Sequence, residues 1–204
     1  MHHLDLNHLR GIHKLCISHA QDFVAASDVS PEIGTVCRHI EVERCSELKD
    51  VVALGKCESV LLRQCISIVR VAALGRTKAV TLIDCPNVKA NDILYQLDDV
   101  ARLHVENSGT IRAVGQLGGS TVQRTATNRG GVKQWRRISL VLDGYSNLRE
   151  LRGLGTVHTL TVRRCAAILD ATALRNVHTL TLEDCQRLRD ISALSSCTNV
   201  TLRN

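Results

Sequence analysis

Aromatic side chains are almost absent from this chain of 204 residues. They make up 2% of it, although 44% of the residues are hydrophobic. A compact globular core normally uses large rings to fill an irregular interior. A core of Leu, Val, Ile, Ala and Cys indicates instead a narrow interior, filled by similar small side chains at each level.

Proline, long apolar runs and a targeting segment are also scarce or missing. Two prolines leave little room for extended linkers. No segment approaches the roughly 20 apolar residues of a membrane-spanning helix, and the start at Met1, His2 and His3 does not open a secretory signal peptide. We therefore expect an intracellular protein, in the cytoplasm or on the cytoskeleton, with no membrane partner.

Motifs of catalysis and nucleotide binding are missing as well. The sequence has no G-x-S-x-G, Walker or dinucleotide signature, and its cysteines and histidines form no C-x-x-C or H-x-x-x-H pair. We expect no enzyme activity, no catalytic residue, no cofactor, no metal site and no small-molecule substrate.

The sequence does contain a repeat. The segment V-H-T-L-T-V-R-R-C ending at Cys165 returns 20 residues later as V-H-T-L-T-L-E-D-C ending at Cys185. With this Cys as position zero, each unit reads apolar-x-x-L-x-L-x-x-C-x-x-L-x-D-x-x-A-L. Position zero is occupied in turn by Ala20, Cys45, Cys65, Cys85, Ser108, Tyr145, Cys165 and Cys185. A fixed period with several aligned apolar columns predicts a solenoid.

The register of the repeat breaks in three places, and the largest break holds an insertion at 118–137. Glycine pairs lie at 118–119 and 130–131, which favours a surface loop; a degenerate extra coil on 121–127 is the alternative. We expect one solenoid over 1–204 with about eight or nine coils. It begins and ends within a repeat, so we expect a fragment, or ends that a partner covers.

The two halves of each unit predict different structures. The L-x-L core alternates like a strand with one buried face. About a dozen residues remain for the return, which favours a 3-10 turn or an extended arc over a full helix. Coils bury their Leu residues only by stacking, so the strands should pair in parallel, one per coil.

This pattern resembles the leucine-rich-repeat family, in its cysteine-containing form L-x-x-L-x-L-x-x-C-x-x-L, over nearly the whole chain. The segment Leu188–Cys197, L-R-D-I-S-A-L-S-S-C, is similar to repeats of trypanosomatid leucine-rich-repeat proteins. The resemblance implies a curved solenoid with a parallel sheet on its concave face, used mainly for protein recognition. Ala20, Ser108 and Tyr145 depart from the family pattern at position zero.

The cysteines at position zero are interpreted as small buried side chains whose S–H groups donate to loop carbonyls. A metal or redox site is the alternative, but stacked thiols without an imidazole or carboxylate are poor zinc ligands. Reduced thiols indicate a reducing compartment. Cys16 differs, because its place between Leu15 and Ile17 predicts an exposed thiol.

Two polar columns have structural interpretations too. His158 and His178 occupy equivalent positions in adjacent coils, so they should stack side by side; a metal pair is the alternative. Asp50, Asp170 and Asp190 form an acidic column, with Glu150 in the same register. We expect these side chains to accept backbone N–H bonds in turns.

The predicted partner surface is made by outward strand positions, four and two residues before position zero. Its apolar middle, with Leu61, Ile83 and Val141, indicates a protein contact. The predicted contact residues on the concave face are Glu41, Glu43, Leu61, Arg63, Thr81, Ile83, His104, Glu106, Val141, Asp143, Thr161, Arg163, Thr181 and Glu183.

The insertion is the second predicted contact region, because it is basic and holds the sole Trp. Its candidate residues are Arg124, Arg129, Lys133, Trp135, Arg136 and Arg137. Arg and Trp are enriched at protein hot spots, and they also bind RNA through phosphate contacts and stacking. A solvated loop is the other interpretation.

Together these features predict a non-catalytic scaffold or adaptor that binds protein partners within a multi-subunit assembly. A ribonucleoprotein component, contacting RNA through the insertion, is one alternative. The substrate-recognition part of a ubiquitin ligase is another, because cysteine-type repeats often accompany F-box segments. No F-box-like helical segment precedes these repeats, so we rank that alternative last.

Overall fold

The computed structural model describes residues 12–25, 33–89, 93, 97, 100–109, 139–152 and 154–203. The chain forms two compact units, unit 1 from Met1 to Thr110 and unit 2 from Ile111 to Asn204. Each is described by itself. The described part of the chain has no helix with the length and hydropathy that a membrane span requires.

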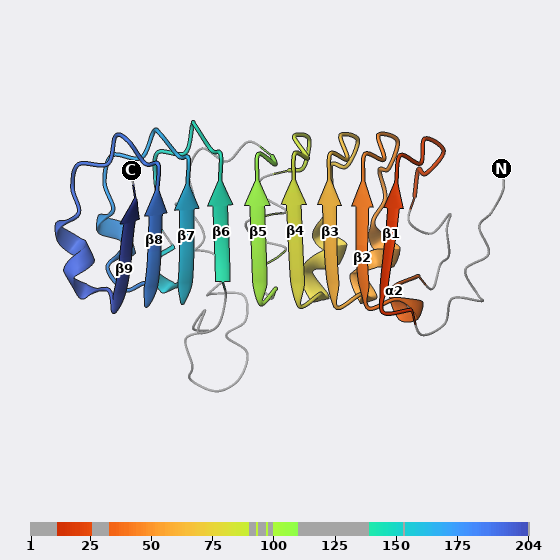
Figure 1. Ribbon diagram of the computed structural model, residues 1–204, viewed down its shortest axis with the longest axis horizontal. Helices are drawn as coiled ribbons and strands as arrows, with labels where there is room; N and C mark the ends of the chain where they lie inside the picture. Colours follow the sequence, from red (N-terminus) through yellow and green to blue (C-terminus); the bar gives the residue numbers. More distant parts are fainter. Residues whose placement is uncertain are drawn as a thin grey trace, which may run out of the picture. The chain divides into compact units, whose positions relative to one another are not determined.

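Unit 1 contains five parallel strands in chain order (Figure 1). They are β1 (Lys14–Ser18), β2 (His39–Glu43), β3 (Ser59–Arg63), β4 (Ala79–Ile83) and β5 (Arg102–Glu106). Equivalent repeat positions pair across the strands, so Ile40 lies beside Val60 and Val60 beside Val80. The predicted parallel pairing, one strand per coil, is confirmed.

Unit 2 repeats this arrangement with four strands. They are β6 (Ser139–Asp143), β7 (Thr159–Arg163), β8 (Thr179–Glu183) and β9 (Asn199–Arg203). Leu160 pairs with Leu140 on one side and with Leu180 on the other. The register therefore follows the 20-residue period of the sequence.

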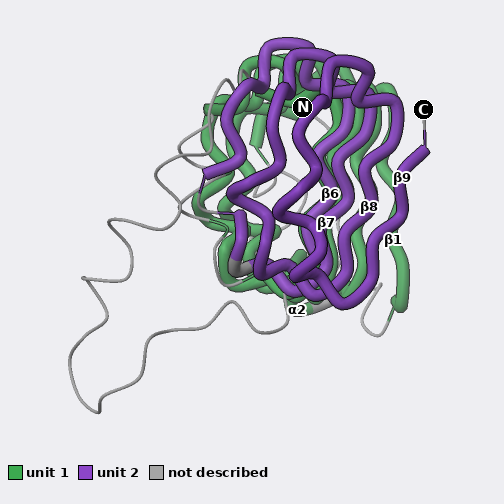
Figure 2. The backbone as a smooth tube through the Cα atoms, turned by 90° about the vertical axis from the view of Figure 1, so that its left-hand side faces the viewer, with its two compact units in different colours: residues 1–110 green, residues 111–204 purple. Residues whose placement is uncertain are grey.

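The return arcs that the structure describes contain only short helical turns, as the small number of residues available for them predicts. Unit 1 has α2 (Ile33–Val36), η2 (Val52–Lys56) and η3 (Ala72–Arg76), and unit 2 has η5 (Leu154–Thr156), η6 (Thr172–Leu174) and η7 (Ser192–Ser196). Arcs of successive coils contact each other within each unit. In Figure 2, each coil of unit 2 is a flattened loop with its strand on one side and its arc on the other.

The core consists of the predicted columns. Cys45, Cys65, Cys85, Ser108, Tyr145, Cys165 and Cys185 are all buried at position zero. One further column is buried, although the repeat formula gives it no fixed residue type. It lies six residues after position zero and contains Val51, Val71, Leu151 and Ala171. Thr77 is buried in the small-apolar column, where its hydroxyl donates a 2.9 Å hydrogen bond to the carbonyl of Leu74.

The residue just before position zero has a left-handed backbone in each described coil, with φ between 45° and 79°. It is Gly144 in one coil and a non-glycine residue in the others, for example Arg44, Gln64 and Asp184. This conformation turns the chain so that the next side chain enters the core. The N–H of Gln64 also donates to the carbonyl of Ile83, at 2.9 Å, so the turn extends the hydrogen-bond ladder.

Candidate partner-binding surface

The predicted face residues all lie at outward positions of the strands. In unit 1 they form two rows, and Leu61 lies in one of them between Glu41 and Thr81. Most are half-buried, but Ile83 is only 8% exposed and Asp143 only 5%. These two side chains offer little surface to a partner. Parallel pairing thus brings the unit 1 residues together in a regular array, and the unit 2 residues in another.

An acid–base pair stands on β1 and β2. The Lys14 Nζ atom lies 2.7 Å from Glu41 Oε1, and the Cys16 thiol donates to Glu41 Oε2 at 3.4 Å. Hydrogen bonding to Lys14 lowers the pKa of Glu41. Desolvation raises the pKa of Cys16, and the hydrogen bond to Glu41 raises it further. Cys16 is exposed, as predicted.

The other end of unit 1 presents His104 on β5. Its Nε2 atom is buried and has no hydrogen-bond partner among the described residues. The carboxylate oxygen Glu106 Oε2, on the same strand, lies 3.9 Å from it. This part of the face therefore holds a polar group that the strand itself does not satisfy.

The face of unit 2 combines threonine and charge. Thr161 and Thr181 are neighbours in register, and Thr181 pairs in turn with Thr201. Beside them, Arg163 Nε lies 3.0 Å from Glu183 Oε2. The buried Asp143 accepts a 2.7 Å hydrogen bond from Arg164 Nε, an arginine that the sequence did not single out.

The histidines stack where the repeat places them. The rings of His158 and His178 lie 4.6 Å apart between centroids, with planes 11° apart, which confirms the predicted stack. A second pair was not predicted, because its members occupy different columns of the repeat, and His39 pairs in register with Lys14. His13 and His39 meet edge to face with centroids 4.6 Å apart.

The cysteines at position zero, here called the cysteine ladder, are buried, and all nine cysteines of the chain are free thiols. The Cys165 thiol donates to the carbonyl of Arg163 at 3.1 Å, and the other thiols at position zero also donate to backbone carbonyls, as predicted. Burial raises the pKa of Cys57 to about 11, and that of Cys65 and Cys165 to about 12. These thiols therefore stay protonated at neutral pH.

The acidic column forms the predicted turns. Asp50 and Asp170 each accept a hydrogen bond from the backbone N–H two residues later, at 2.7 and 2.6 Å. Asp190 does the same at 2.9 Å. Hydrogen bonds from Thr172 and Ser192 lower the pKa of Asp170 and Asp190, respectively.

The insertion lies outside the described residues. Its candidate residues Arg124, Arg129, Lys133, Trp135, Arg136 and Arg137 therefore remain predictions from the sequence.

No family model and no curated protein matches this chain. A solved structure is similar to it, the leucine-rich repeat domain of the type III effector XopL. The TM-score is 0.59 at 12% sequence identity, over 93% of this chain and 76% of that one. With the parallel strands and short arcs of both units, this similarity shows that the fold is a leucine-rich-repeat solenoid.

Proposed function

We propose that this chain is a non-catalytic scaffold or adaptor that binds protein partners within a larger assembly through the outward face of its sheets. One observation carries the proposal. Parallel pairing holds the outward side chains in register on a backbone whose N–H and C=O groups are bonded to the next coil. Such a surface loses little conformational freedom when a partner binds.

Leu61 is the centre of this surface in unit 1. It is half-buried, it lies in register with Glu41 and Thr81, and Arg63 follows two residues later on the same face. An apolar centre with a polar rim is the usual anatomy of a protein interface. Binding energy in such interfaces is concentrated in a few central side chains.

The state of the cysteines supports a non-catalytic role and a reducing compartment. A cysteine nucleophile needs a lowered pKa, whereas burial raises the pKa of Cys57 and Cys65. Free thiols persist mainly in reducing compartments. We also propose the cysteine-containing repeat type and one solenoid across residues 1–204, supported by the shared period and by the buried thiols at position zero.

The insertion supports a second candidate, a ribonucleoprotein role in which RNA contacts 118–137. Five basic residues and Trp135 lie in that segment without an acid. RNA affinity that falls steeply with salt, and that is lost when Arg136 and Arg137 are changed to Gln, would support it.

The test of the scaffold proposal compares two variants of one coil. Leu61→Glu changes the outward face, and Ile66→Glu changes a 50% exposed residue in the loop after β3. Partners captured by the tagged chain are identified by mass spectrometry, and the leading partner is purified for binding measurements. We expect Leu61→Glu to weaken its Kd at least tenfold, about 1.4 kcal/mol, and Ile66→Glu to leave it unchanged. Equal loss in both variants, or none in Leu61→Glu, would refute this role of the face.

A further inference from the structure

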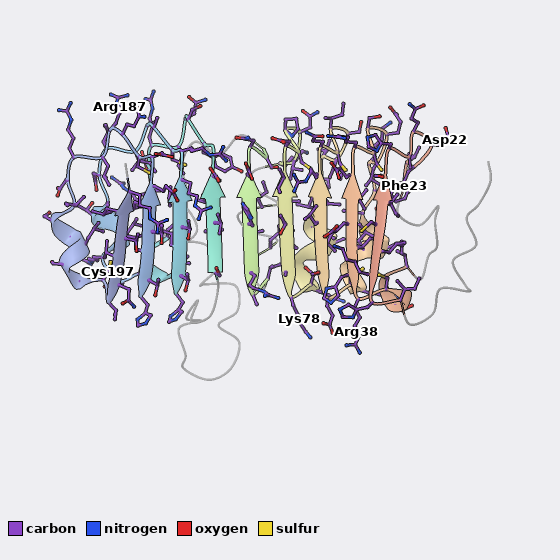
Figure 3. The ribbon with its side chains drawn as sticks, in the orientation of Figure 1. Asp22, Phe23, Arg38, Lys78, Arg187 and Cys197 are labelled. Atoms are coloured by element: carbon purple, nitrogen blue, oxygen red, sulfur yellow. The ribbon has the colours of Figure 1, made fainter. Side chains whose placement is uncertain are left out.

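The strands of unit 1 begin at an edge that is rich in positive charge. We define the strand-start edge as residues 36–39, 56–59 and 76–79, which lead into β2, β3 and β4. It carries four cations and one acid. The cations are Arg38, Lys56, Arg76 and Lys78, and all four are exposed. Figure 3 shows Arg38 and Lys78 projecting beyond the strands on this side.

The opposite edge of the same coils differs in charge. Residues 44–50, 64–70 and 84–89, which follow the strands, hold four cations and three acids. The excess of cations over acids is therefore three at the strand-start edge and one at the opposite edge. The net charge of the whole chain does not by itself explain this difference.

Most of the positive charge at the strand-start edge is not neutralised locally. Lys78 Nζ lies 3.3 Å from Glu58 Oε1, and this contact lowers the pKa of Glu58. No carboxylate of the described residues lies within ion-pair distance of Arg38, Lys56 or Arg76. Their charges are available to a ligand.

We propose that the strand-start edge of unit 1 binds the phosphodiester backbone of a nucleic acid, without reading its sequence. Adjacent coils of a parallel sheet are about 4.8 Å apart. The four cations come from three successive coils, one each from the first two and two from the third, so they form a row along the coil axis that the phosphates of an extended strand can follow. Arg102 at the start of β5 continues the positive charge by one coil, to a length of about 14 Å, whereas Lys14 on β1 is paired with Glu41.

The chemistry of this edge favours a polyanion over a protein surface. The core of a protein interface is usually apolar or aromatic. The exposed large hydrophobic residues described in unit 1 are Val24, Val52, Ile66 and Val69, all outside the strand-start edge. The same edge has no Phe, Tyr or Trp ring on which bases could stack, and the ring of His39 already packs edge to face with His13. Phosphate contacts alone account for binding that is independent of sequence. The proposal uses a surface distinct from the outward face and does not rest on the proposed function.

The experiment measures the binding of the full chain to labelled 20-nucleotide single-stranded RNA, single-stranded DNA and duplex DNA by fluorescence anisotropy between 50 and 300 mM salt. The test variant changes Arg38, Lys56, Arg76 and Lys78 to Gln. The control variant removes the same number of charges from exposed positions elsewhere, by changing Lys49, Lys89, Arg187 and Arg189 to Gln. Thermal unfolding verifies that both variants fold.

For the single strands, we expect the test variant to lower the salt slope, d log K against d log salt, by about 3 and to weaken binding on the order of 100-fold near 0.1 M salt. The control variant should change the salt slope and the affinity far less. RNA and DNA should bind alike, and Leu61→Glu should retain binding.

Equal losses of affinity in the test and control variants would overturn the proposal, as would no binding of any oligonucleotide at 50 mM salt. Displacement of RNA by polyglutamate as readily as by unlabelled RNA would overturn it too, in favour of an acidic peptide. Loss of binding only when the basic residues of 118–137 are changed would assign it to the insertion.

Discussion

The Cys65 thiol reaches into the preceding coil, where it donates a hydrogen bond of 3.6 Å to the backbone carbonyl of Val42. It also donates to the carbonyl of Arg63, at 3.4 Å. A protonated sulfur can donate in this way and a thiolate cannot. The cysteine ladder thus connects coils as long as its thiols keep their protons.

The first prediction is that alkaline pH destabilises the solenoid. Burial raises the pKa of Cys65 to about 12, from an ordinary value of 9.0. Above pH 9 the unfolded chain loses this proton and the folded chain keeps it. The stabilisation is complete below pH 9 and declines by about 1.4 kcal/mol per pH unit until pH 12. Urea unfolding at pH 8 and pH 10 measures the decline.

The variant Cys65→Val is the control for this prediction. Its free energy of unfolding should fall by about 1 kcal/mol less between pH 8 and pH 10 than that of the unchanged chain. An identical fall in both proteins would show that the thiol is not the titrating group.

The second prediction concerns Cys16, the exposed thiol among nine. In the native protein, Cys16 should react rapidly with a thiol reagent, the half-buried Cys197 more slowly and the buried cysteines only on unfolding. Glu41→Gln should speed this reaction at pH 8, because Glu41 raises the pKa of Cys16. Stopped-flow absorbance measures the rate, and Glu43→Gln serves as the neighbouring control. A slower reaction in Glu41→Gln would contradict the assigned contact.

The third prediction is that Gly55 tolerates no side chain. A Cβ atom at Gly55 would lie 3.1 Å from the carbonyl carbon of Ala73 in the next coil and closer still to its oxygen. Backbone atoms cannot move aside as a flexible side chain does. Gly55→Ala should therefore cost about 1–3 kcal/mol, measured by chemical denaturation. Lys56→Ala, at the adjacent exposed position, should have little effect; equal costs would refute the close approach.

The fourth prediction uses the left-handed backbone of Asp184, whose φ is 53°. Glycine adopts this region freely, whereas alanine is strained there by about 1 kcal/mol or more. Asp184→Gly should therefore be more stable than Asp184→Ala. At Glu183, one residue earlier in β8, the ranking should reverse. If the glycine and alanine variants rank in the same order of stability at both positions, the backbone conformation is not the cause.

The repeat predicted the strands and most of the core because a fixed period repeats the same apolar residue at the same depth. The buried column that contains Val51 and Ala171 was not predicted, because the side chains in it vary in size. The left-handed positions were not predicted either. Arg44 and Gln64 do not signal this conformation, although Asn107, Gly144 and Asp184 in the same column are residue types that favour it.

The candidate surfaces were predicted less completely than the fold. Alternation along a strand separates inward from outward positions, so the face residues follow from sequence, whereas the burial of Ile83 and Asp143 depends on neighbours in space. The strand-start edge was missed because its cations are divided between two repeat columns, Lys56 and Arg76 in one and Arg38 and Lys78 in the other, and the second column also holds Glu58. Their proximity comes from the stacking of coils.

Within each unit the hydrogen bonds of the sheet run from one strand to the next, along the direction in which the coils stack. A force that pulls the terminal coils of a unit apart therefore loads its coil–coil interfaces in series, one after another. Each interface bears the full tension, and the weakest one opens first. Extended along this direction, each unit should therefore open one coil–coil interface at a time.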